Sequence, residues 1–74
     1  MARLPTISGR AALDAFIKDG LSFVRQRGSH MILIKPGHVA SLSVPDHKEL
    51  AKGTLRSLLR CAGITPERFI ELLG

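Results

Sequence analysis

Residues 27–35 of this 74-residue chain read RGSHMILIK, a tight turn followed by an apolar run. Gly28 permits the turn, and the β-branched side chains of Ile32 and Ile34 favour an extended strand over residues 29–35. An apolar strand of this kind needs a neighbouring strand on each side. We therefore expect residues 29–35 to form the central strand of a small sheet.

The segment before the turn supplies one neighbouring strand. Leu21 and Phe23 alternate with Ser22, which predicts a half-buried strand that ends near Arg27. Joined through Gly28, this strand and the central one are predicted to form a β-hairpin.

A second tight turn and a third strand follow. Residues 35–38 place Pro36 and Gly37 at the central positions of a type II turn. Over residues 39–44, apolar and polar residues alternate, as they do in a strand with one buried face. The expected buried face consists of Ala40, Leu42 and Val44. Three consecutive strands joined by two tight turns predict an antiparallel meander.

A helical pattern precedes the strands. Ser8 is a candidate N-cap for a helix that runs to about Asp19, and Gly20 suits the left-handed residue after its C-terminal end. The face expected to be buried carries Ala12, Leu13, Phe16 and Ile17.

Two further helices are predicted after the strands. Thr54 is expected to cap the first and Gly63 to close it, while Thr65 and Pro66 are expected to begin the second. The expected buried residues are Leu55, Leu58, Leu59 and Ala62 in the first, and Phe69, Ile70, Leu72 and Leu73 in the second. The order α-β-β-β-α-α predicts an α+β fold in a single domain over residues 1–74, with the helices on one face of a three-stranded antiparallel sheet.

The net charge of +5 and the pI near 10.4 indicate a polyanionic partner. Nucleic acid is one such partner, and an acidic protein is the alternative that composition leaves open. No apolar run approaches the roughly 18 to 20 residues that span a bilayer, so no membrane association is expected. Cys61 is the single cysteine, which fits a reducing cytoplasm and a small packed residue better than a nucleophile.

His30, with Arg25 and Arg27 shortly before it, is the candidate catalytic residue. Histidine exchanges protons near neutral pH. Cleavage of RNA needs a base for the ribose 2′-hydroxyl, an acid for the leaving 5′-oxygen, and cations for the charge that builds on the phosphoryl oxygens. The alternative is a surface histidine beside a turn without a chemical role.

A second basic feature lies on the helix that follows the strands. Lys52, Arg56 and Arg60 are spaced to lie on one flank, and Gly53 and Thr54 expose the first N–H groups of that helix to an anion. Such groups can hold an RNA backbone through phosphate contacts, which give affinity rather than sequence choice. A solvated charged flank is the alternative.

His38 and His47 are spread over a turn and a loop, with no close pair at ligand spacing to join His30. We therefore expect no metal site, and no cofactor.

The sequence also resembles a known family. Residues 20–30, GLSFVRQRGSH, look like the core signature of the HicA toxins, which are the small RNA-cleaving partners of bacterial HicA–HicB toxin–antitoxin pairs. The likeness continues through VPDH at 44–47, KGTLRSLL at 52–59 and AGI at 62–64, with Phe69 beyond it. Where Met31 stands, the family often has a second histidine or a polar residue, which leaves the substrate pocket open to change.

This resemblance implies a fold like that of double-stranded-RNA-binding domains and the activity of a metal-independent mRNA interferase that arrests translation. It places the catalytic role on His30 and implies a HicB-like antitoxin in a multimeric complex. Separately, Ser29 beside His30 is a candidate to assist through a hydroxyl hydrogen bond. The candidate RNA contacts are Arg25, Arg27, Ser29, Lys52, Thr54, Arg56 and Arg60. A non-catalytic RNA-binding module with the same basic surface is the alternative, followed by a small adaptor for an acidic protein.

Overall fold

The computed structural model describes residues 3–37 and 41–74. In chain order its elements are α1 (Gly9–Lys18), β1 (Ser22–Arg27), β2 (His30–Ile34), β3 (Ser41–Pro45), α2 (Lys52–Ala62) and α3 (Pro66–Leu73). The strands form an antiparallel sheet in the order β1-β2-β3. The predicted α+β fold, its element order and the central position of the strand after the turn are therefore confirmed.

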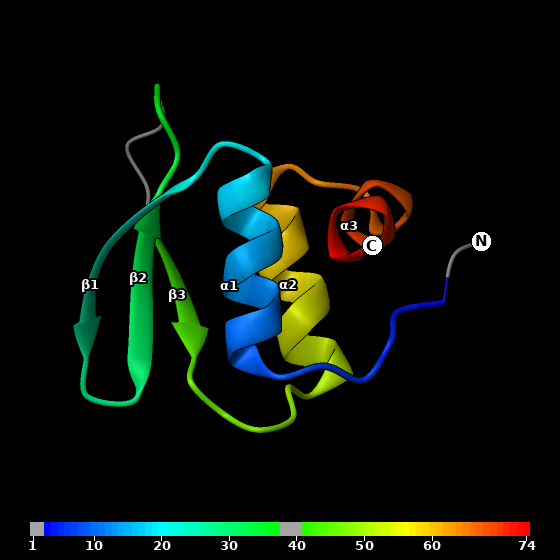
Figure 1. Cartoon of the computed structure of the whole chain (residues 1–74), viewed down its shortest axis with the longest axis horizontal. Coiled ribbons are helices and arrows are strands. Elements are labelled where there is room, and N and C mark those ends of the chain that lie inside the picture. Colours follow the sequence, from blue (N-terminus) through cyan, green and yellow to red (C-terminus); the bar gives the residue numbers. More distant parts are fainter. Residues whose placement is uncertain (1–2, 38–40) are drawn as a thin grey trace.

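The helices lie on one face of the sheet (Figure 1). α1 and α2 pack over β3, and α3 packs mainly against α1, so β1 is the edge strand farthest from the helices. We call the face of the sheet that points away from the helices the open face. Within residues 3–37 and 41–74, no helix combines the length and apolarity that crossing a bilayer would require.

The hydrophobic core lies between the sheet and the helices. The sheet contributes Met31, Leu33, Leu42 and Val44. At the centre of the helical layer, the rings of Phe16 and Phe69 have centroids 5.5 Å apart and are inclined by 44°. Such tilted aromatic pairs stabilise a core beyond the area that they bury. The predicted burial of Leu42 and Val44 is confirmed.

Part of the second predicted turn lies outside the described residues. His38 of that turn and Ala40 of the third predicted strand are among the residues not described. Gly37 has a φ of +84°, the value that the third residue of a type II turn requires.

Side chains and glycine define most helix ends as predicted. The Ser8 hydroxyl accepts a hydrogen bond from the Ala11 N–H at 3.1 Å, and the Thr65 hydroxyl accepts one from the Arg68 N–H at 3.1 Å. Gly63 ends α2 in the left-handed region with a φ of +73°. These contacts satisfy backbone groups that a helix leaves without partners at its ends.

The prediction that Thr54 caps α2 is wrong, because the helix begins at Lys52 with Ala51 as its N-cap. Leu50 is buried, and its N–H donates to the Ile7 carbonyl at 2.8 Å. The chain is thus anchored just before the helix and turns into it at once. Thr54 lies inside the first turn.

Three apolar residues predicted to be buried are instead exposed: Ile17 by 43%, Phe23 by 45% and Ile70 by 37%. Phe23 lies on β1, which is exposed along its whole length, so the prediction of a half-buried first strand is wrong. This strand extends beyond the helices, and among the described residues no helix packs closely on its inner face. In α1, packing against α3 buries Ala15 and leaves Ile17 at the margin.

Gly9 joins the start of α1 to the end of the sheet. Its N–H donates to the His47 carbonyl at 2.8 Å. A β-carbon at this position would overlap the backbone carbonyl oxygen of Pro45. The close approach of helix and strand therefore depends on the absence of a side chain at residue 9.

We expect Gly9→Ala to lower the free energy of unfolding by about 2 kcal/mol, because the strand or the helix must shift to admit the methyl group. Gly53→Ala is the matched control, since a β-carbon there meets no atom within 4 Å. That variant should stabilise the protein by about 0.5–1 kcal/mol through helix propensity. Urea unfolding of the two variants measures both values, and equal stabilities would contradict the expectation.

Candidate functional site

His30 is the first residue of β2 and follows the two-residue turn of Gly28 and Ser29. Gly28 has a φ of +61°, so a glycine occupies the first turn position, as in II′ turns. His30 is exposed, whereas the next residue, Met31, is buried on the helix side. Since side chains alternate along a strand, His30 lies on the open face.

Arg27 lies beside His30 on the open face. The two residues are directly paired across β1 and β2, and Pro45 of β3 pairs with His30 from the other side. Directly opposed residues in an antiparallel pair point to the same face, with β-carbons about 5 Å apart. The sheet therefore brings a cation next to the candidate catalytic imidazole.

A β-bulge places Arg25 on the same face. Phe23 pairs with the buried Leu33, and Arg25 pairs with Ile32, so Val24 is an extra residue on β1. In a regular strand residues 23 and 25 would share a face. The bulge separates them, leaving Phe23 on the helix side and turning Arg25 onto the open face.

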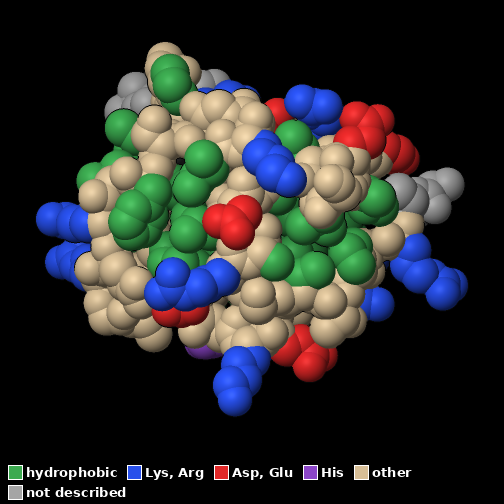
Figure 2. Space-filling view, viewed as in Figure 1, with side chains coloured by type: hydrophobic (Ala, Val, Ile, Leu, Met, Phe, Trp, Pro, Cys, Tyr) green, Lys and Arg blue, Asp and Glu red, His purple; other side chains and the backbone are tan. Residues whose placement is uncertain are grey.

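The edge of the sheet is consequently basic. Arg25 and Arg27 are exposed, and neither forms an ion pair with another described residue. In Figure 2, basic side chains project from the margin of the molecule where β1 lies. This edge offers guanidinium groups that are free to bind an anion.

The turn before His30 is held by a polar network that the sequence analysis missed. The Asp46 N–H donates to the Ser29 carbonyl at 2.7 Å. The Gln26 side-chain amide donates to the Gly28 carbonyl at 3.2 Å and to the Asp46 carboxylate at 3.0 Å. Arg10 reaches the same carboxylate at 3.4 Å. Gln26 and Arg10 are separated from Asp46 by 20 and 36 positions in the sequence. Neither the hydrophobic period nor the spacing of motifs indicates contacts between residues so far apart.

Ser29 contributes its carbonyl to this network. Among the described residues, its hydroxyl has no hydrogen bond that would assign it an assisting role. That role stays a prediction.

The basic residues of α2 lie in the helical layer, apart from the open face. Lys52, Arg56 and Arg60 are exposed, and Thr54 is partly buried. Arg56 and Arg60 line a shallow pocket of about 260 Å³ at the junction of α2 and α3. The start of α2 lies at the same end of the molecule as the β1–β2 turn (Figure 1). The structure thus separates the predicted contacts into two surfaces.

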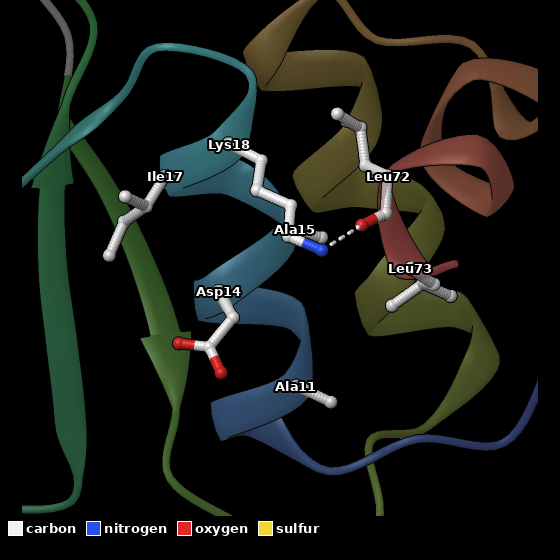
Figure 3. A pocket seen from close by; sticks show the side chains of 7 residues that line it. All are labelled: Ala11, Asp14, Ala15, Ile17, Lys18, Leu72 and Leu73. Carbon is white, nitrogen blue, oxygen red and sulfur yellow. Dashed lines mark hydrogen bonds between the residues drawn. The ribbon is translucent and has the colours of Figure 1, made fainter.

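A second hollow, of about 440 Å³, lies between α1 and α3 (Figure 3). Its charged residues are Asp14 and Lys18. The Lys18 ammonium group donates a hydrogen bond to the Leu72 carbonyl, near the end of α3, at 3.1 Å. Ile17 lies on the strand side of α1, away from Leu72. None of the predicted site residues lines this hollow.

No three histidine, cysteine, aspartate or glutamate side chains within residues 3–37 and 41–74 gather as a metal site would need. His47 is exposed, and His38 lies outside the described residues. The prediction that Cys61 is a packed residue is wrong: it is exposed on α2, because the buried stripe passes through Leu58 and Ala62 instead.

A family model described as the HicA toxin of bacterial toxin–antitoxin systems matches residues 9–64, from the start of α1 to just past α2. The match includes the turn, His30 and both basic surfaces. A comparison with curated proteins found no match.

Proposed function

The chain belongs to the HicA toxin family, and from this premise we propose that it is a metal-independent endoribonuclease that cleaves mRNA and arrests translation. Membership gives the chain the role of toxin and implies an antitoxin of the HicB type as its partner. We propose that His30 performs the chemistry as a general acid or base. The observation that carries this is an exposed histidine on the open face directly opposite Arg27.

The proposed reaction is a transesterification within the RNA strand. A base removes the proton of a ribose 2′-hydroxyl, and the oxygen attacks the adjacent phosphorus. The bond to the 5′-oxygen breaks, and an acid protonates that oxygen. The products are a 2′,3′-cyclic phosphate and a free 5′-hydroxyl. His30 takes one of the two proton transfers, and water takes the other.

Arg27 and Arg25 supply the charge that this reaction needs. Negative charge builds on the non-bridging phosphoryl oxygens as the attack proceeds, and a guanidinium beside the imidazole stabilises it. Both arginines lie on the open face of β1, with Arg27 opposite His30 and Arg25 opposite Ile32, and both lack a competing acidic partner in the described part of the chain. We assign Arg27 to the scissile phosphate and Arg25 to a neighbouring one, with Ser29 beside them.

The α2 surface is proposed to hold the RNA backbone away from the scissile bond. Lys52, Arg56 and Arg60 supply cations along one flank. The Thr54 N–H is one of the first-turn donors without a partner inside the helix, since the bond from the Leu55 N–H to the Ala51 carbonyl is the first. Binding without cleavage is the second candidate function, which the separation of α2 from the open face favours.

We expect His30→Gln to slow RNA cleavage by about 10²- to 10⁴-fold and to remove growth arrest, because glutamine cannot transfer the proton. Cleavage of labelled RNA in the presence of EDTA measures the rate. His47→Gln, which changes an exposed histidine outside the strands, is the matched control and should retain cleavage. A wild-type protein that binds RNA without cleaving it would favour the second function, and an active His30→Gln variant would overturn the assignment.

Removing one positive charge should affect RNA cleavage when the charge lies on the open face, and RNA binding when it lies on α2. Arg27→Ala should reduce the single-turnover rate at saturating RNA by about 10²-fold, because it removes a contact to the charge of the transition state. Arg60→Ala should leave that rate unchanged and weaken binding. Its log–log salt slope for single-stranded RNA should fall by about 0.7, the value of one phosphate contact. Binding is measured with uncleavable 2′-O-methyl RNA, and identical behaviour of the two variants would contradict the division.

A further inference from the structure

We propose that Gln26 and Asp46 are positioning residues for His30, and that they set the backbone of the turn that carries it. We call these two residues the turn clamp. The inference rests on the proposed function of His30 and adds residues that act through it. Neither side chain is proposed to touch RNA.

The main-chain contact of the clamp extends the sheet past the last strand pair. His30 pairs with Pro45, and the Asp46 N–H then donates to the Ser29 carbonyl at 2.7 Å. This bond fixes the peptide that joins Ser29 to His30. The end of β3 therefore determines where the backbone of His30 lies.

The side-chain contacts hold the other turn residue. A carboxamide has two N–H donors, and Gln26 directs its nitrogen to the Gly28 carbonyl at 3.2 Å and to the Asp46 carboxylate at 3.0 Å. The bond to the carboxylate is charge-assisted and thus stronger than one between neutral groups. The carbonyls of both turn residues, Gly28 and Ser29, are in this way tied to Asp46.

The clamp lies on the opposite side of the hairpin from the imidazole. Gln26 pairs with Met31, whose side chain is buried on the helix side, whereas His30 is on the open face. RNA bound at the open face would not reach Gln26. Its influence on cleavage must therefore pass through the backbone.

Asp46 is itself held in place from the helical layer. Gly9 packs against the Pro45 carbonyl and donates to the His47 carbonyl, which fixes the chain on both sides of Asp46. The Asp46 side chain is 25% exposed, whereas the Arg10 side chain that approaches it is 64% exposed. Exposed ion pairs contribute little, so we assign the positioning to Gln26 and Asp46 rather than to Arg10.

The turn needs such support because β1 is an exposed edge strand. A two-stranded hairpin is marginally stable by itself, and all the residues from Ser22 to His30 are exposed. Catalytic groups must be held within roughly 0.5 Å of their productive positions. Release of the turn should therefore slow the reaction while the core, which the clamp does not enter, stays folded.

The experiment compares Gln26→Leu, Asp46→Ala and Asp46→Asn with the wild-type protein. The first two should reduce the single-turnover rate at saturating RNA by about 10²-fold, the scale for a misplacement of about 1 Å. The affinity for 2′-O-methyl RNA should change less than about twofold. Asp46→Asn should keep most of the rate, because its amide oxygen still accepts the Gln26 N–H. Asp19→Ala is the matched control: its carboxylate also pairs with an arginine and is 18% exposed, but it lies at the other end of α1.

Two further readouts separate positioning from a general loss of structure. The double variant Gln26→Leu/Asp46→Ala should be no slower than the slower single variant, because the residues act as one unit. In Gln26→Leu, the Asp46 amide hydrogen should exchange faster with solvent, while the amides of Met31 and Leu33 stay protected.

Wild-type rates in both single variants, multiplicative losses in the double variant, or an unchanged exchange rate of the Asp46 amide would each overturn the turn clamp. If the wild-type protein cleaves RNA and the His30→Gln variant does not, each of these outcomes leaves the proposed function standing. Full cleavage by His30→Gln overturns the proposed role of His30, on which the clamp rests, and that is a different and separately visible result.

Discussion

Because Met31 and Leu33 of β2 are buried against the helices, His30 must stand on the opposite face of the sheet. A strand has a period of two, so this packing fixes every other side chain of β2 at once. On the same side, β3 adds Leu42 and Val44 to the core. The open face is thus free for chemistry, because the stability of the fold resides on the other side.

The bulge at Val24 extends this division to β1. The first part of the strand follows the pattern of the core side, with Phe23 opposite Leu33. One extra residue then reverses the pattern, and both arginines join His30 on the open face. The bulge therefore places Phe23 on the helix side of the sheet and Arg25 and Arg27 on the open face.

Local patterns predicted the elements, most of the buried stripes and the caps at Ser8, Thr65 and Gly63, because these features depend on neighbours within one or two turns of chain. The errors arose where tertiary structure intervenes. Thr54 failed as a cap because the contact between Leu50 and Ile7 anchors the chain one turn earlier. Phe23 failed as a core residue because β1 extends past the helices, which its alternation does not reveal.

For the candidate site, the sequence placed the cations of β1 near His30 simply because they are close along the chain. It gave no indication that Arg56 and Arg60 belong to another surface, since a helix flank has no fixed orientation until the helix is packed. The sequence drew attention to Asp46 only as part of the VPDH stretch at residues 44–47, which resembles the HicA family. Its contact with Gln26 depends on the registers of both strand pairs, which bring together residues from the two edge strands on either side of β2.

The exposed β1 edge also bears on how copies of this protein behave at high concentration. An unpaired edge strand can recruit the edge of another molecule and start aggregation. Here the strand is interrupted by a bulge at Val24, and its far half carries Arg25 and Arg27. Two such edges brought together would oppose like charges and mismatched backbones. The arginines that attract a phosphate to this edge thus also disfavour pairing of β1 with β1 of another copy of the protein.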